Sequence, residues 1–111
     1  MTERRPGSGK LRRVAPHTFE VDGALRLRPE VLAFAQIMEQ KLRANDHKGG
    51  WKSDAPGPLF DRMLEEVNEA WQAMLKWPRD TKAYRDSLAG ELADVANFAM
   101  MVADQNGCLK R

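Results

Sequence analysis

Residues 59–76 read LFDRMLEEVNEAWQAMLK, and this stretch decides the fold class. Its apolar residues recur every three or four positions, which is the spacing of one face of an α-helix. The Trp77-Pro78 step ends the pattern, because a proline disfavours helical backbone at the residue before it. The sequence therefore predicts an amphipathic helix over 59–77 whose apolar stripe faces the core. The stripe consists of Phe60, Met63, Leu64, Val67, Trp71, Met74 and Leu75.

Two further helices are predicted, over residues 29–44 and 81–106. Pro29 suits a first helical position, and Gly107 is a natural helix stop. Residues 95–103 read VANFAMMVA, which is apolar on nearly every side of a helix and predicts a buried segment. Ala, Leu, Met, Glu, Lys and Arg dominate the chain, whereas Val and Ile are few, so an all-α fold is favoured over a sheet.

The composition narrows the class of protein. With 111 residues, the chain is the size of one domain. No apolar run approaches the ~20 residues of a membrane span. The single cysteine, Cys108, forms no internal disulfide, and with His17 and His47 it makes no recognisable zinc set. The basic N-terminus lacks the apolar segment of a signal peptide, so we expect a cytoplasmic protein.

Residues 1–28 differ from the rest of the chain. Residues 1–13 carry a charge balance of +4, whereas the remaining 98 residues carry −2. We interpret 1–28 as a basic, flexible N-terminal tail with one extended piece around Thr18–Leu27, and 29–111 as the helical domain. Such a tail is usually a solvated arm, although it is also the kind of segment that contacts nucleic acid.

Residues 45–58, NDHKGGWKSDAPGP, are rich in helix breakers. Connections of this length in compact proteins are usually functional or disordered. The loop places an aromatic residue, Trp51, between two cations, Lys48 and Lys52. We regard these three residues as candidates for binding a ligand.

Five carboxylates fall in two tight groups on the second and third predicted helices. They are Glu65, Glu66 and Glu69, then Glu91 and Asp94. Residues three or four apart lie on neighbouring turns of a helix, so the acids of each group can converge on one point.

The two groups differ in their predicted surroundings. The first group lies opposite the apolar stripe, which by itself favours a solvent-exposed acidic face. The second group borders the apolar segment of its helix, where unpaired carboxylates are strongly destabilising unless a cation compensates them. The nearest basic residues on that helix are Lys82 and Arg85, upstream of the group. A metal ion is therefore the favoured partner.

The ligand types narrow the choice of metal. Carboxylate oxygens suit hard cations, above all Mg²⁺, with Mn²⁺ as a possible substitute. A di-iron helical bundle would need a Glu-x-x-His motif on two helices. Val14 precedes His17 by three residues and Ala44 precedes His47, so that motif is absent.

These residues resemble the MazG-like all-α nucleoside triphosphate pyrophosphohydrolases. Glu-Glu-x-x-Glu on one helix and Glu-x-x-Asp on the next, with 21 residues between Glu69 and Glu91, are similar to the family's signature. The loop HKGGW at 47–51 and the run ADVANFAMM at 93–101 are similar to a bacterial and phage subgroup of dATP/dGTP diphosphohydrolases. The resemblance covers residues 34–104.

The resemblance implies Mg²⁺-dependent hydrolysis of a (deoxy)nucleoside triphosphate to the monophosphate and pyrophosphate. It implies that Glu66, Glu69, Glu91 and Asp94 bind the metal, while Glu65 is a further ligand or the base that orients the attacking water. In the family the active unit is a dimer or a dimer of dimers, which implies a helical bundle completed by homo-oligomerisation. Burial of Phe98, Met100 and Met101 would follow from that assembly.

The roles of the candidate substrate contacts stay open. Lys48 and Lys52 would supplement the metal at the phosphates, and Trp51 would either stack on the base or cap the core. Asn97 would hydrogen-bond the nucleotide or make a structural amide contact. The alternative to the enzyme is a non-catalytic helical oligomer with a solvated acidic face and a basic tail that binds nucleic acid.

Overall fold

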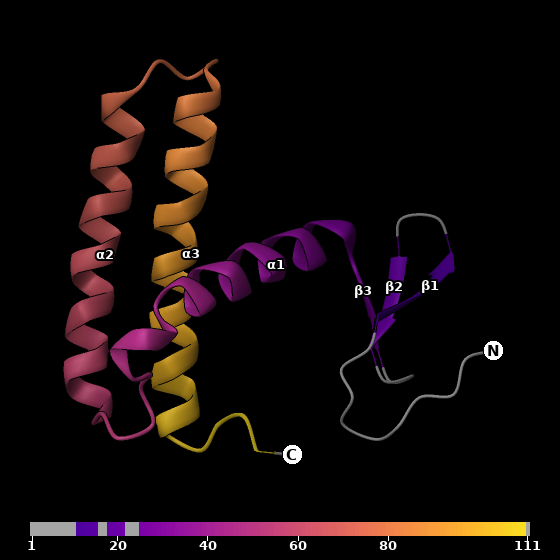
Figure 1. Ribbon diagram of the computed structural model, residues 1–111, viewed down its shortest axis with the longest axis vertical. Coiled ribbons are helices and arrows are strands. Elements are labelled where there is room, and N and C mark those ends of the chain that lie inside the picture. Colours follow the sequence, from indigo (N-terminus) through magenta and orange to yellow (C-terminus); the bar gives the residue numbers. More distant parts are fainter. Residues whose placement is uncertain (1–10, 16–17, 22–24, 111) are drawn as a thin grey trace. The chain divides into compact units, whose positions relative to one another are not determined.

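The computed structural model describes residues 11–15, 18–21 and 25–110, and most of them are helical (Figure 1). The helices are α1 (Pro29–Ala44), α2 (Pro56–Lys76) and α3 (Lys82–Gln105), with a short 3₁₀ helix, η1 (Asp46–Lys48), between the first two. The prediction of a mostly helical chain is confirmed, and each predicted helix is present with ends within three residues of the expected ones.

The largest difference in helix ends lies at the start of α2. Pro56, Gly57 and Pro58 were expected to belong to the loop, but they form the first turn of the helix. Proline is tolerated there because the first amide groups of a helix have no carbonyl partner within it. The breaker-rich stretch is therefore shorter than the sequence suggested. Its glycines still act as turn residues, because Gly49 and Gly50 have positive φ angles of 101° and 74°.

Both ends of α3 are defined by local signals, a cap at its start and a stop at its end. At its start, the Thr81 hydroxyl accepts a hydrogen bond from the Tyr84 amide at 3.1 Å, which is an N-terminal cap. At its end, Gly107 adopts a positive φ of 75°, and the Cys108 amide donates to the Ala103 carbonyl at 2.9 Å. This closing bond satisfies a carbonyl that the helix leaves unpaired, so the predicted stop at Gly107 is confirmed.

The segment before α1 contains a small antiparallel sheet. Its strands β1 (Leu11–Ala15), β2 (Thr18–Val21) and β3 (Leu25–Leu27) pair in the order β1-β2-β3. The extended piece expected around 18–27 coincides with β2 and β3, whereas β1 was not expected, because strands this short leave no sustained alternation in the sequence. Residues 1–10, which hold much of the predicted basic tail, lie outside the described residues.

The chain divides into two compact units, residues 1–36 and residues 37–111, and the candidate site belongs to the second. In that unit α2 and α3 form an antiparallel helical hairpin joined by residues 77–81 (Figure 1). None of the helices among the described residues has a stretch both long and apolar enough to cross a lipid bilayer.

Small side chains dominate the core of the hairpin. Its buried apolar residues are Leu59, Ala70, Ala73 and Ala93, and Ala93 is 0% exposed. Small residues allow the backbones of two helices to approach closely, and three of these four buried apolar residues are alanines.

The apolar stripe of α2 does not face this core, which corrects the sequence prediction. Phe60, Leu64, Val67, Trp71 and Leu75 are all exposed, and Leu75 is 64% exposed. The face of α2 that contacts α3 lies roughly a third of a turn away from the stripe around the helix axis.

Candidate metal centre

The carboxylates of the two helices meet across the hairpin. Glu66 comes from α2, while Glu91 and Asp94 come from α3, and oxygen atoms of the three side chains all lie within 4.8 Å of one another. The antiparallel pairing of α2 and α3 brings the two sequence groups together, and the spacing of Glu91 and Asp94 puts both on the same face of α3. We call Glu66, Glu91 and Asp94 the acidic triad.

Burial and mutual repulsion make the acidic triad costly in the absence of a cation. Glu66 is only 8% exposed. Burial, followed by the negative charges of Glu69, Asp94 and Glu91, raises the pKa of Glu66 to about 6. Burial together with the charges of Glu69 and Asp94 also raises the pKa of Glu91. Both carboxylates would be stabilised in their charged forms by a bound cation.

Glu65 and Glu69 have different positions relative to this triad. Glu69 lies beside it, since its charge acts on both Glu66 and Glu91. Glu65 points elsewhere: its side chain is 64% exposed, and its Oε1 lies 3.2 Å from Nε of Arg62. Of the five predicted acids, the structure therefore gathers four and leaves Glu65 outside.

Two basic residues that the sequence analysis did not propose lie next to the acids. The Nζ atom of Lys41, from the end of α1, is 3.3 Å from Oδ2 of Asp94. The positive charge of Arg62 lowers the pKa of Glu66 against the stronger raising effects. Lys41 lies far from Asp94 in the sequence and on another helix, so no local spacing rule could have found it.

An open pocket of about 310 Å³ lies over Glu66, Glu69 and Asp94. The remaining lining residues are three cations, one amide and one aromatic, namely Lys41, Lys48, Arg62, Asn45 and Phe98. We call this the acidic pocket. Its carboxylates offer only oxygen ligands, which Mg²⁺ and Mn²⁺ prefer, so the residues present fit the predicted type of cation.

A second pocket of about 280 Å³ adjoins the acidic pocket and has apolar walls. The two share Asn45, Lys48, Arg62 and Phe98. Its apolar walls are Leu42, Trp51, Leu59, Phe98 and Met101, and the carboxylates Asp46 and Asp54 also line it. We call this the apolar pocket. One continuous surface thus passes from carboxylates and cations to aromatic and aliphatic side chains.

The three predicted loop residues have separate environments. Lys48 lines both pockets. Trp51 lines the apolar pocket, and its indole Nε1 donates a hydrogen bond to Oδ2 of Asp104 at 2.9 Å. Lys52 lines neither pocket, because its Nζ lies 2.6 Å from the same Asp104 oxygen. The sequence analysis missed Asp104, which is one of sixteen acids and belongs to neither carboxylate group.

Asn97 makes the structural contact that the sequence analysis left as one of two options. The side chain is 4% exposed, and its Nδ2 donates to the backbone carbonyl of Met38 at 3.0 Å. This bond ties the second half of α1 to the middle of α3. Asn97 lines neither the acidic pocket nor the apolar pocket.

Comparisons with protein-family models, with curated proteins and with solved structures found no match for this chain.

Proposed function

We propose that this chain is a Mg²⁺-dependent nucleoside triphosphate pyrophosphohydrolase of the MazG-like type, which converts a (deoxy)nucleoside triphosphate and water to the monophosphate and pyrophosphate. The observation that carries the proposal is the acidic triad, whose three carboxylates lie within 4.8 Å of one another and of which Glu66 and Asp94 line the acidic pocket. Lys41 and Arg62 offset part of the repulsion among these groups, and protons or a metal cation would offset the remainder. Near neutral pH, above the raised pKa of Glu66 at about 6, a cation is the effective partner.

The second support is the order of the two pockets. A nucleoside triphosphate has a polyanionic end that binds metal ions and a flat, largely apolar base at the other end. The acidic pocket and the apolar pocket present the matching chemistry side by side and share Lys48 and Arg62 at their junction. Cations at that junction suit phosphate oxygens, because arginine and lysine make charge-assisted hydrogen bonds to them.

The reaction needs little covalent chemistry from the protein. A water oxygen bonds to the α-phosphorus, the bond to the oxygen that bridges the α- and β-phosphates breaks, and pyrophosphate leaves. Mg²⁺, when bound, would neutralise charge on the phosphates and make the attacking water more acidic. Glu66, Glu69, Glu91 and Asp94 would hold the cation, and a carboxylate oxygen of Glu66 would accept the proton of the water. Mn²⁺ is the expected substitute, because it prefers the same oxygen ligands.

The roles of the other predicted residues follow from their positions. Lys48 binds phosphate, and Trp51 forms one wall of the base site. We assign Lys52 and Asn97 no contact with substrate, because each is engaged elsewhere in the protein. Glu65 is paired with Arg62 and is not part of the proposed metal-binding set. Purine deoxynucleotides such as dATP and dGTP are the first substrates to test. A nucleotide substrate is consistent with the cytoplasmic location that we expect.

The proposal includes a homo-oligomer, at least a dimer. The exposed stripe of α2 presents five large apolar side chains on one helix face. Contiguous apolar surface of this kind marks an interaction site. Phe98, Met100 and Met101 are half-buried within the chain, so α2 contributes more apolar surface to the proposed interface than α3 does.

The experiment is an incubation of the full chain with Mg²⁺ and a panel of ribo-, deoxy- and modified triphosphates, with the products resolved by chromatography. Monophosphate and pyrophosphate in equal amounts, lost on addition of EDTA and in Asp94→Asn, support the proposal. Asp86→Asn is the control, because Asp86 is exposed and pairs with Lys82 away from the site. Diphosphate and phosphate as products, or no turnover of any triphosphate, would contradict it.

Thermal melting separates the enzyme from a non-catalytic oligomer whose acids form a solvated face. A cation that binds only the folded state raises the melting temperature in proportion to the logarithm of its concentration. A Mg²⁺-dependent rise that persists after removal of residues 1–10 and is lost in Glu66→Gln indicates a site. An equal, weak response in wild type and Glu66→Gln would indicate general screening of surface charge.

A further inference from the structure

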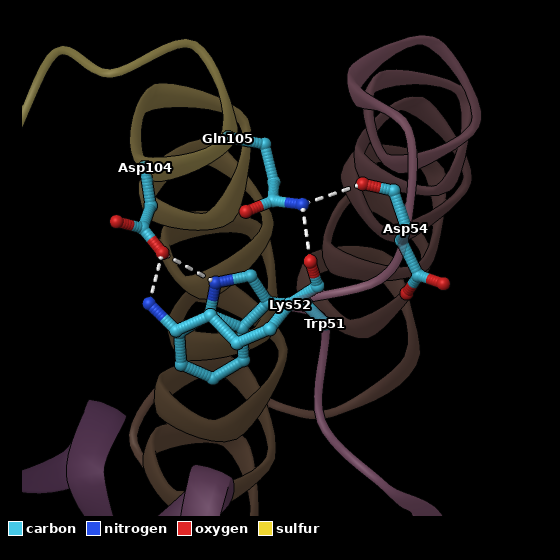
Figure 2. A network of polar contacts seen from close by, with 5 residues as sticks. All are labelled: Trp51, Lys52, Asp54, Asp104 and Gln105. Carbon is cyan, nitrogen blue, oxygen red and sulfur yellow. Dashed lines mark hydrogen bonds and ion pairs between the residues drawn. The ribbon is translucent and has the colours of Figure 1, made fainter.

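The end of α3 holds the segment that carries Trp51 through four polar contacts (Figure 2). Oδ2 of Asp104 accepts from the Trp51 indole at 2.9 Å and from Nζ of Lys52 at 2.6 Å. Nε2 of Gln105 donates to the carbonyl oxygens of Lys52 and Asp54 at 2.9 and 2.7 Å. Two consecutive side chains of a helix thus hold three residues of a loop that lies far from them in the sequence.

Asp104 is suited to this task because it acts as a charged acceptor. Hydrogen bonds from Lys52 and then from Trp51 lower the pKa of its carboxyl group. A carboxylate that receives charge-assisted hydrogen bonds holds its donors more firmly than a neutral acceptor does. Its side chain is only 21% exposed, so water competes for these contacts less than it does at an open surface site.

The loop itself does little to orient the indole. Trp51 follows Gly49 and Gly50, which both have positive φ angles and nothing within 4 Å of the position of a Cβ atom. Glycine ordinarily reaches both left- and right-handed backbone regions, so this stretch is weakly restrained by local sterics. The hydrogen bond from its nitrogen to Asp104 therefore restrains the direction of the Trp51 ring (Figure 2).

We propose that Asp104 is a positioning residue that holds the Trp51 indole in place as a fixed aromatic wall of the apolar pocket, with Gln105 holding the backbone that follows. The inference rests on the proposed function, in which that pocket receives the nucleobase. It also gives the two loop lysines, Lys48 and Lys52, different roles. Lys52 stabilises the Asp104 contact and lies 5.3 Å from the centre of the Trp51 ring, whereas Lys48 remains at the acidic pocket.

The first test needs no nucleotide and stands apart from the proposed activity. The full chain is labelled with 5-fluorotryptophan, and the ¹⁹F resonances of Trp51, Trp71 and Trp77 are assigned through single Trp→Phe variants. We expect Asp104→Ala to shift and broaden the Trp51 resonance and to leave the other two in place. Asp104→Asn retains an oxygen that accepts from the indole, and should keep a sharp Trp51 signal. An unchanged Trp51 resonance in Asp104→Ala would overturn the proposal.

The second test measures steady-state hydrolysis of dATP and dGTP. We expect Asp104→Ala to raise KM about tenfold, because base stacking on a disordered ring is weakened, while kcat and the Mg²⁺ dependence stay within about twofold of wild type. Asp104→Asn should lie between wild type and Asp104→Ala. Asp86→Asn, an exposed acid of the same helix, is the matched control and should leave KM unchanged. A general loss of stability would lower the fraction of active enzyme, and hence apparent kcat, without this selective change in KM.

Trp51→Phe guards against a variant that fails to fold, because it keeps an aromatic ring while it removes the indole donor and part of the ring surface. We expect it to raise KM, and the double variant Trp51→Phe/Asp104→Asn to raise KM no further. Independent, multiplying effects of the two changes would overturn the proposal. If wild type hydrolyses no triphosphate, the proposed function fails, while the ¹⁹F spectra still decide whether Asp104 orients Trp51.

Discussion

On the two faces of α2, burial is the reverse of what hydrophobicity predicts for a single chain. The face that packs on α3 carries a glutamate, Glu66, about one turn before Ala70 and two turns before Ala73, and all three residues are buried. The face that carries Leu64, Trp71 and the other large apolar side chains is exposed. The more hydrophobic face of the helix is therefore not the one that the chain covers by itself.

We infer from this difference that the two faces of α2 serve two different requirements. Small side chains on the inner face let α2 and α3 approach closely enough for carboxylates of both helices to share one site. The large apolar residues are left for a second surface, where an equivalent chain would cover them in the proposed oligomer. Burial of charge on the inner face destabilises the isolated chain, and such a cost is typical of functional sites.

The largest effect is expected when the inner face loses its charge. Asp94→Asn and Glu66→Gln should each lower Mg²⁺-dependent turnover by about 100-fold or more, because changes even in residues that support metal ligands cost 10–100-fold. In EDTA, Glu66→Gln should be as stable as wild type or more stable, since it removes repulsion from the triad. Product chromatography and urea denaturation measure the two effects. Turnover near the wild-type rate in both variants would remove these residues from the metal site.

The next largest effect is expected on the outer face. Trp71→Glu should dissociate the oligomer at micromolar concentration, because burial of one large apolar side chain contributes about 1.5–3 kcal/mol and a buried charge opposes association. Sedimentation velocity measures the mass. Ala83→Glu, an exposed change in the first turn of α3, should leave the assembly intact. If wild type itself sediments as a monomer, the outer face has no such role.

A smaller effect is expected from pH in the absence of divalent cations. The pKa of Glu66 is about 6 in the folded chain and 4.5 as its ordinary value, so between these values the folded state binds more protons than the unfolded state. The free energy of unfolding should therefore fall as pH rises from about 4.5 to 6, by at most about 2 kcal/mol. The raised pKa of Glu91 acts in the same direction. Urea denaturation across this window should show the slope in wild type and a flatter one in Glu66→Gln. A wild-type slope of the opposite sign would contradict the assignment.

The smallest effect is expected one residue away, at Glu65. Glu65→Gln removes an exposed ion pair with Arg62, and such pairs contribute about 0–1 kcal/mol. We expect Mg²⁺ affinity, measured by calorimetry, to stay within about twofold of wild type. A small effect of Glu65→Gln beside a large effect of Glu66→Gln would sharpen the contrast between the exposed and buried sides of α2. A large loss of affinity in Glu65→Gln would instead place this residue in the metal set.

The sequence by itself determined the helices and most of their ends. Pro29 as a helix start and Gly107 as a stop act within a few residues, so they were recognised without the rest of the fold, whereas Pro56 and Pro58 at the start of α2 were expected in the loop. The pairing of Glu91 with Asp94 on one face is likewise a property of a single helix. The prediction that these two acids need a cation rested on the apolar residues around them and on the lack of a basic residue one turn away. The structure brings Glu66 to the same point, but it also places Lys41 at 3.3 Å from Asp94.

Tertiary structure alone decided which way each helix face points and which distant residues meet. Hydrophobic periodicity shows that a helix has an apolar side, but it does not state whether that side is covered by the same chain or by another. For this reason the stripe of α2 was wrongly expected in the core, and Glu66 on the opposite side was weighed as a surface acid. Contacts such as Lys41 with Asp94, or Trp51 with Asp104, join segments about fifty residues apart and depend on packing that no local pattern records.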